Sequence, residues 1–280
     1  MAQFLNKDSG LGWEAGPAGA VPWQMVPMGG ARGIKLIGGA DLEIRCRSAN
    51  ITSGATDGLT YTETPLTGAA HREIWLQGRN KGEYVVEAFK PESGVVVAML
   101  GAGVFPLRTV KIAYYRLPAA RKWDSKRVND VAHNILFPQA NVKVEWLGNW
   151  GNEFGYSVKL PEKINIVDDK QRDELRAYGD APAADLKVYF AWTIQSEQAG
   201  KVTNAITYLG RTVIDSLRRN ASEIPRMGRT VAHEIGHFIS NADGPSHDDK
   251  SSDLMYGDST PTPGTIVRRK RIQRFGRDDK

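Results

Sequence analysis

The sequence predicts an α+β protein in two parts, a β-sandwich followed by a mixed sheet backed by helices. Two features of the chain predict it. Glycine is concentrated early, with 17 of the 29 glycines before residue 104, and short alternating segments there are separated by turns. Beyond Pro106, segments with the period of strands instead alternate with segments that have the period of helices. We therefore expect a β-domain over residues 1–106 and a second domain over residues 107–280.

The first part has the strand pattern of a β-sandwich. Leu42–Arg47 alternates apolar and charged residues, as in a strand with one buried face. The sequence GRNKG at 78–82 predicts a turn. Segments rich in apolar, β-branched and aromatic residues are expected to form further strands at 72–77, 84–90 and 94–100. Several strands about 8–12 residues apart are typical of a sandwich, and this part resembles a bacterial immunoglobulin-like module.

The second part has the predicted element order β-α-β-β-β-α. Asp124 can cap a helix that runs to about residue 137, and we expect Pro138 to end it. A second helix is expected over residues 226–239 because its apolar residues recur at helical spacing. Strands are expected at 108–117, 141–147, 186–194 and, as an edge strand, 205–214.

Composition and charge narrow the class of protein. Hydrophobic residues make up 41% and charged residues 25%, as in soluble globular proteins. Residues 268–280 carry seven basic and two acidic groups, which accounts for the whole net charge of +5. We therefore expect no nucleic-acid-binding surface, and we interpret the basic stretch as the solvated face of a terminal helix.

Membrane, secretion and disulfide features are not expected. The longest apolar run, residues 95–105, is shorter than the ~20 residues that a membrane-spanning helix needs. The first residues, MAQFLNKDSG, lack a basic region followed by an apolar one, so we expect a cytoplasmic protein or one exported without a classical signal peptide. Cys46 is the only cysteine, so no intrachain disulfide can form.

The sequence HEIGH at 233–237 has the residue types and the spacing of a zinc site on a helix. Positions i and i+4 share one helix face, so His233 and His237 can present both imidazoles to one ion. Glu234 lies about 100° around the helix and can reach a water on that ion without binding the ion. The pattern therefore predicts one Zn²⁺ as cofactor, with the two histidines as ligands and Glu234 as the catalytic general base.

A methionine follows at a distance that carries a family resemblance. In SSDLMYG, Met255 lies eight residues after His247. Together with HEIGH, this resembles the metzincin clan of zinc endopeptidases over about residues 107–280. The resemblance implies a metzincin-like catalytic domain in which Met255 belongs to a methionine turn that forms a hydrophobic floor beneath the metal. It also implies a hydrolase, a metalloprotease acting on a peptide or protein substrate that lies along the edge strand. We assign no ligand role to Tyr256.

The third zinc ligand stays open between two residues. The clan's pattern is HExxHxxGxxH, and this chain has Ser240 at the glycine position and Asp243 at the third-ligand position. Counting back from Met255 favours His247 instead. Both His₃ and His₂Asp sites hold catalytic zinc. A turn at Asp-Gly-Pro would explain Asp243 without a metal, so we prefer His247 and keep Asp243 as the alternative.

These observations predict a zinc-dependent endopeptidase that hydrolyses peptide bonds with a metal-activated water and Glu234 as general base. One alternative is a binding or adhesion protein whose zinc site is structural or vestigial. Another is an exported toxin with the same peptidase chemistry. The first domain could be a prodomain, a targeting module or a docking surface for a partner.

Overall fold

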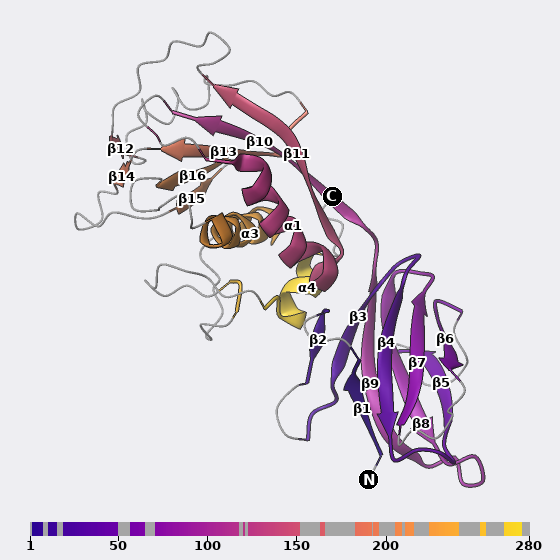
Figure 1. Cartoon of the computed structure of the whole chain (residues 1–280). Helices are drawn as coiled ribbons and strands as arrows, with labels where there is room; N and C mark the ends of the chain where they lie inside the picture. The colour runs from indigo at the N-terminus through magenta and orange to yellow at the C-terminus, as the bar shows by residue number, and fades with distance from the viewer. Residues whose placement is uncertain are drawn as a thin grey trace. The chain divides into compact units, whose positions relative to one another are not determined.

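The chain forms two compact units in the computed structural model (Figure 1). Unit 1 comprises Met1–Arg108, Pro138–Asn141 and Val267–Lys280, and unit 2 comprises Thr109–Phe137 and Val142–Ile266. The independence of two domains divided at residue 106 stays a prediction. The residues described are 2–7, 11–15, 19–49, 57–64, 71–117, 120, 123–151, 163–165, 183–191, 193–195, 205–208, 211–215, 224–240, 253–255 and 266–275.

Unit 1 contains two sheets that share one apolar core. One sheet has the strand order β1-β4-β7-β6 and the other β2-β3-β9-β8-β5. The strands are β1 (Gln3–Asn6), β2 (Trp13–Glu14), β3 (Trp23–Pro27), β4 (Ala31–Ile37), β5 (Glu43–Ser48), β6 (Leu59–Thr64), β7 (His71–Gly78), β8 (Gly82–Phe89) and β9 (Val96–Phe105). The immunoglobulin-like character of this unit stays a prediction.

Alternation along the strands builds this core. On β5, Ile44 and Cys46 are buried while Glu43 and Arg45 are exposed, as the period of two predicts. Ile74 on β7 is buried in the same cluster, so side chains of both sheets meet there. Burial raises the pKa of the Cys46 thiol to about 12, which keeps it a neutral, unreactive packing residue.

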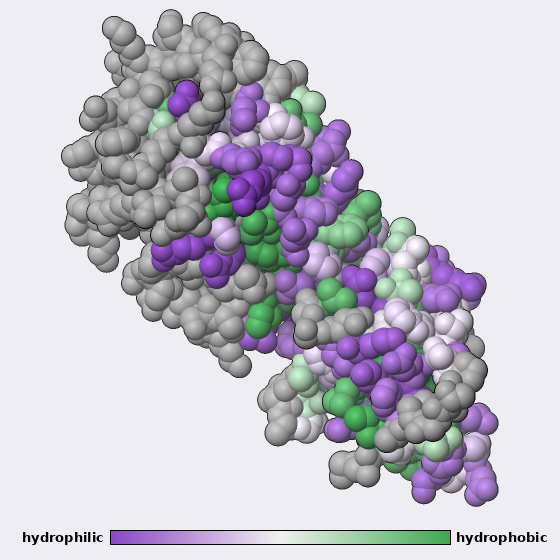
Figure 2. Space-filling model, in the orientation of Figure 1, coloured by the Kyte–Doolittle hydropathy of each residue, from purple (hydrophilic) through white to green (hydrophobic). Residues whose placement is uncertain are grey.

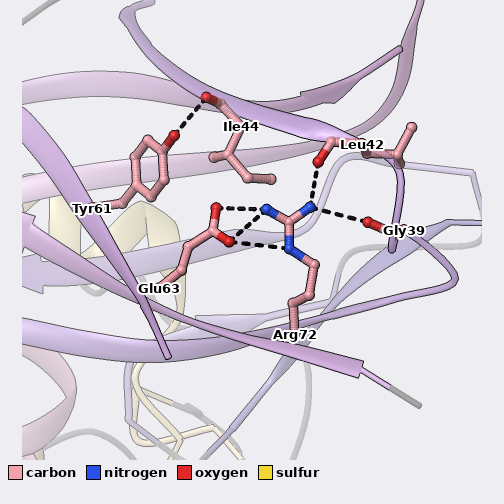
Figure 3. Close-up of polar contacts among 6 residues, drawn as sticks. All are labelled: Gly39, Leu42, Ile44, Tyr61, Glu63 and Arg72. Carbon is pink, nitrogen blue, oxygen red and sulfur yellow. Dashed lines mark hydrogen bonds and ion pairs between the residues drawn. The ribbon is translucent and has the colours of Figure 1, made fainter. Parts of the chain in front are cut away.

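Arg72 joins the turn between β4 and β5 to the edge of the first sheet (Figure 3). Its Nε and Nη2 donate to the Glu63 carboxylate on β6, at 3.1 Å and 2.6 Å for the two oxygens. Its Nη1 donates to the carbonyl of Gly39 at 3.0 Å and also to that of Leu42. Beside it, the Tyr61 hydroxyl donates to a carbonyl of β5 at 2.8 Å. The two sheets are thus linked by polar contacts as well as by the core.

Unit 2 contains a mixed sheet with the strand order β11-β10-β13-β16-β15. β10, β13 and β16 run parallel, and β15 pairs antiparallel with β16 at the edge. The bounds are β10 (Arg108–Arg116), β11 (Val142–Gly151), β13 (Leu186–Ala191), β15 (Ala205–Tyr208) and β16 (Arg211–Asp215). A separate pair consists of β12 (Lys163–Asn165) and β14 (Thr193–Gln195). With its helices, the chain has the predicted α+β class.

The predicted edge strand over 205–214 is wrong as a single strand. It is two antiparallel strands, of which β15 is the edge and β16 lies inside the sheet. Gly210 stands between them in the sequence, and glycine is a frequent turn residue. The ten residues therefore contain two strands, and only the first of them borders the open side of the sheet.

Helix α1 (Ser125–Ala140) begins as predicted and ends later than predicted. Asp124 caps it, because its Oδ1 accepts the N–H of Arg127 at 3.1 Å. Pro138 does not end the helix, which continues to Ala140. A proline in the last turn removes one hydrogen bond and leaves the preceding turns intact. The helix instead ends at Asn141, whose φ of 55° is the left-handed conformation common at helix ends.

Helix α3 (Ile224–Ser240) packs closely on α1 through a glycine. A Cβ at Gly228 would lie 2.4 Å from the Cβ of Val131 on α1, so only glycine allows this approach. Among the described residues, no helix is long and apolar enough to cross a membrane. On the face drawn in Figure 2, hydrophilic side chains cover most of the described surface and apolar ones form small separate groups.

Candidate metal centre

Helix α3 carries the HEIGH residues on a mostly buried stretch. Pro225 stands in its first turn, where the missing N–H has no helical partner to lose. The apolar residues that recur along its inner face are fully buried: Met227, Val231, Ala232, Ile235 and Ile239. This burial confirms an amphipathic helix and excludes a solvated helix with incidental histidines.

His233 and His237 bring their Nε2 atoms together, as their spacing predicts. The two Nε2 atoms are 3.0 Å apart, and the ring centroids are 4.7 Å apart with the rings at 78°. His233 is buried, with 8% of its surface exposed, and His237 is half-buried. The pair therefore lies at the boundary between the core and the surface.

A backbone carbonyl determines the tautomer of His233. Its Nδ1 lies 2.6 Å from the carbonyl oxygen of Leu254. A carbonyl can only accept, so Nδ1 carries the proton and the lone pair of the neutral ring is on Nε2. Metal-ligating histidines typically donate their second ring N–H to such an acceptor, which fixes the ring and makes the ligating nitrogen more basic.

The geometry of the pair fits one zinc ion. Nitrogen ligands lie ~2.0–2.1 Å from zinc, so two of them in a tetrahedral site are about 3.3 Å apart. The observed 3.0 Å between the Nε2 atoms of His233 and His237 is close to this distance. Because the lone pair of His233 is on Nε2, this atom accepts a hydrogen bond from Nε2–H of His237. Neutral imidazole is a common zinc ligand, so the residues present fit the metal.

Glu234 is buried beside the pair. Only 6% of its surface is exposed, although it is a carboxylate on a helix that reaches the surface. Buried carboxylates are rare unless they have partners or a function. It follows His233 directly and precedes His237 by three residues, so it lies on the flank of the face that bears the imidazoles.

Met255 lies in the segment that holds His233. Leu254 and Met255 are fully buried, and Asp253 is nearly so. A buried methionine directly after the carbonyl that binds His233 is consistent with the predicted methionine turn. The segment is held in turn by Ile266, whose carbonyl accepts the Leu254 N–H at 2.8 Å.

The two candidates for the third ligand, Asp243 and His247, lie outside the described residues, as does Tyr256. Within the part of the chain that the structure describes, no three histidine, cysteine, aspartate or glutamate side chains gather as a metal site would require. Of the residues predicted for the site, the structure thus describes His233, Glu234 and His237 on α3 and Met255 after it, and their role at a metal stays a prediction.

Sequence reasoning missed two contacts of this site. The Leu254 carbonyl is one, because every residue has a carbonyl and nothing in its neighbours marks it. The other is Ser240, whose hydroxyl donates to the Gly236 carbonyl at 2.6 Å within the last turn of α3. Serine commonly bonds back to the residue four positions earlier, so this contact could have been anticipated.

Comparisons with known proteins do not identify a family for this chain. No protein-family model and no curated protein matches the chain. Among solved structures, an archaemetzincin from Methanopyrus kandleri aligns with a TM-score of 0.41 and 16% identity, covering 60% of this chain and 93% of that one. A 2,6-sialyltransferase from Photobacterium sp. JT-ISH-224 aligns with a TM-score of 0.14 and 8% identity, covering 64% of this chain and 36% of that one. Likenesses this low carry no argument, so the function must be argued from the site.

Proposed function

We propose that the chain is a zinc-dependent endopeptidase. The observation that carries the proposal is the pair of Nε2 atoms 3.0 Å apart on α3, with the tautomer of His233 fixed by the Leu254 carbonyl. Two imidazoles on adjacent turns, one of them oriented by a backbone carbonyl, suit a shared metal ion. A buried glutamate between them gives the site a proton carrier that a purely structural zinc site does not need.

His247 is the third ligand in this proposal, with Asp243 as the alternative. The length of α3 supports the choice. Ser240, at the position where the metzincin pattern has glycine, is still helical and bonds back to Gly236. Two residues separate Ser240 from Asp243 in the sequence, and six separate it from His247. The longer connection gives more freedom to return a side chain to the metal.

Zinc bound here would polarise a peptide carbonyl and lower the pKa of its water to about 7. His233 and His237 would hold the ion, and the Leu254 carbonyl keeps the first of them in register. Glu234 then takes the proton of the attacking water and delivers it to the nitrogen of the leaving amine. Burial of its carboxylate away from bulk water favours this transfer, because the proton is not exchanged with solvent.

The substrate in this proposal is an extended peptide paired with β15. β15 is one of the two edge strands of the described sheet and lies alongside α3. An edge strand offers main-chain donors and acceptors to a peptide, which binds as an additional strand. This pairing would bring a scissile bond beside the helix that carries His233 and Glu234.

Exchange of Glu234 for glutamine tests the proposal. Glu234→Gln should keep its zinc and lose about 10²–10⁴-fold in the rate of peptide hydrolysis, since an amide cannot accept the proton. His237→Ala is the matched control and should lose both the metal and the activity. The measurements are zinc content after dialysis and turnover of a peptide that the unaltered protein cleaves. A Glu234→Gln protein with full activity, or one without zinc, would contradict the role given to this residue.

A further inference from the structure

Strand β11 is the last strand at one end of the described sheet of unit 2 (Figure 1). A strand at the end of a sheet has one row of backbone N–H and C=O groups without a strand partner. Val144 lies on β11 and is buried, with 4% of its surface exposed, so its backbone groups depend on protein partners rather than on water. Helix α1 supplies these partners from two consecutive turns.

Asn129 and His133, one turn apart on α1, bind the two backbone groups of Val144. The Val144 N–H donates to Nδ1 of His133 at 3.2 Å, and Nδ2 of Asn129 donates to the Val144 carbonyl at 3.3 Å. Asn129 is itself held, because its Oδ1 accepts the hydroxyl of the buried Tyr114 on β10 at 3.2 Å. Residues four apart share one face of a helix, so a single face of α1 holds this part of β11.

The contact with Val144 requires a neutral His133. Because Nδ1 accepts the backbone N–H, the neutral ring carries its own proton on Nε2. A protonated ring has hydrogen on both nitrogens and accepts from neither, so protonation removes this hydrogen bond. His133 is half-buried and stacks on Phe137, with the ring centroids 5.0 Å apart and the rings at 16°. The ring therefore lies at the surface, where it exchanges protons with solvent.

Three charged side chains face His133, from its own helix and from the strand that it contacts. Asp130 and Lys126 lie on α1, and Lys143 lies on β11. Burial of the ring lowers the pKa of His133; Asp130 opposes this shift, and Lys143 and Lys126 add to it. The result is a pKa below the ordinary ~6.5 of histidine, so the ring is neutral at pH 7 and becomes charged as the solution is acidified.

We infer that His133 is a pH-sensitive cap on the edge of β11: the neutral ring covers the Val144 N–H, and protonation opens this contact. A histidine whose pKa is lowered on folding stabilises the fold above its unfolded pKa of ~6.5, and this stabilisation is lost as the pH falls through the folded pKa. The neutral cap also keeps the middle of the edge closed to a further strand. This device goes beyond the proposed function and needs no metal.

The test is a pH titration of the full chain that follows the ring and the amide separately. NMR shifts of the His133 ring report its protonation, and hydrogen exchange gives the protection of the Val144 N–H relative to an unstructured peptide at each pH. The pH is lowered from above ~6.5 to about two units below it. The amide of Tyr189, on β13 between β10 and β16, reports unfolding of the whole unit.

Three variants isolate the contribution of His133. His133→Asn keeps an acceptor near the position of Nδ1 and does not titrate, whereas His133→Phe keeps a ring and removes the acceptor. Asp130→Asn removes the carboxylate that raises the pKa of His133, and because the Asp130 side chain is 48% exposed, the fold should tolerate this change. The histidines of α3 are present in every variant, so an effect of their titration would be common to all.

In the unaltered protein, the protection of the Val144 N–H should fall at least about tenfold as the His133 ring is protonated, while Tyr189 stays protected. Asp130→Asn should move the midpoints of ring and amide to lower pH together. His133→Asn should keep the amide protected at every pH, and His133→Phe should leave it weakly protected throughout.

An amide that stays protected while the ring of His133 titrates would overturn the inference. An equal loss of protection in His133→Asn would also overturn it, because another group would then be responsible. A loss at Val144 only in step with Tyr189 would do the same, since the whole unit would be opening. If a variant at position 133 does not fold, the titrations of the unaltered protein and of Asp130→Asn decide.

Discussion

At the scale of single residues, His233 and His237 differ although the sequence makes them equivalent. His233 is buried with Nδ1 on the Leu254 carbonyl, and His237 is half-buried. The motif could predict the pair because i and i+4 spacing is a local property of a helix. It could not predict the carbonyl, since Leu254 is 21 residues away and meets the ring only through the tertiary fold.

The third ligand can be identified by single substitutions. His247→Ala should release zinc to a mild chelator, because two histidines alone hold the ion weakly. Asp243→Ala should keep the metal and lose at most some stability from a turn. Zinc content after dialysis distinguishes the two, with circular dichroism as the check on folding. A folded, metal-free Asp243→Ala beside a zinc-loaded His247→Ala would favour a His₂Asp site.

Glu87 on β8 should make the stability of unit 1 sensitive to acid. Its buried carboxylate accepts from Arg45 Nε at 2.6 Å and from Arg47 Nε at 2.8 Å. Burial alone would raise the pKa of Glu87, but the two arginine contacts outweigh it and hold the pKa below its ordinary value. Such a group stabilises the fold above its unfolded pKa of ~4.3, and this stabilisation is lost as the pH falls through the folded pKa.

Glu87→Gln should therefore lower the melting temperature at pH 7, and its difference from the unaltered protein should shrink as the pH falls below about 4. Thermal denaturation between neutral and acidic pH measures both. Glu43→Gln on the neighbouring strand is the control, because Glu43 is exposed. A difference between Glu87→Gln and the unaltered protein that is the same at every pH would show that the charge of Glu87 contributes nothing.

At the scale of elements, the helices were easier to predict than the strands. The predicted helix over 226–239 is α3 (Ile224–Ser240), and the capping of α1 by Asp124 is confirmed. Helical spacing and capping are local, so the sequence records them. β15 and β16 were predicted as one strand, because the residue pattern of a short segment fits one strand or two equally well. Pairing with other strands decides between them, and pairing is not local.

β15 is the element on which substrate binding can be tested. Pairs along an antiparallel ladder alternate between hydrogen-bonded and open ones. Only two residues join Tyr208 to its partner Arg211, and the pair beside so short a connection is normally the bonded one. We therefore expect Thr207 to direct its N–H to the open side. Thr207→Pro removes that donor and should raise the KM for peptides at least several-fold with the zinc retained.

The matched variant Thr207→Ala keeps the backbone N–H and should keep the KM. Steady-state kinetics on one cleaved peptide, with zinc content and circular dichroism on each variant, makes the comparison. A folded Thr207→Pro enzyme with an unchanged KM would show that the substrate does not pair with β15 at this residue.

At the scale of the whole molecule, the first and the last residues of the chain belong to the same compact unit. Val267–Lys280 cluster with Met1–Arg108 in unit 1, and the predicted domains 1–106 and 107–280 stay a prediction. The composition of α4 (Arg269–Phe275) predicted a solvated helix because arginine and lysine dominate it. Ile272 and Phe275 are nevertheless buried, and the helix donates hydrogen bonds to Glu14 and Glu83. These hydrogen bonds join residues 255 and 190 positions apart, so the sequence pattern could not predict them.

The central claim, that the helical pair belongs to a zinc peptidase, is tested most directly by one paired measurement on the purified chain. Zinc is quantified by inductively coupled plasma mass spectrometry, and the same sample digests a broad peptide library with and without a chelator. We predict one zinc per chain and cleavage that stops on chelation and returns when zinc is restored. A folded chain that takes up no zinc, or a zinc-loaded chain that cleaves no peptide in the library, would contradict the account.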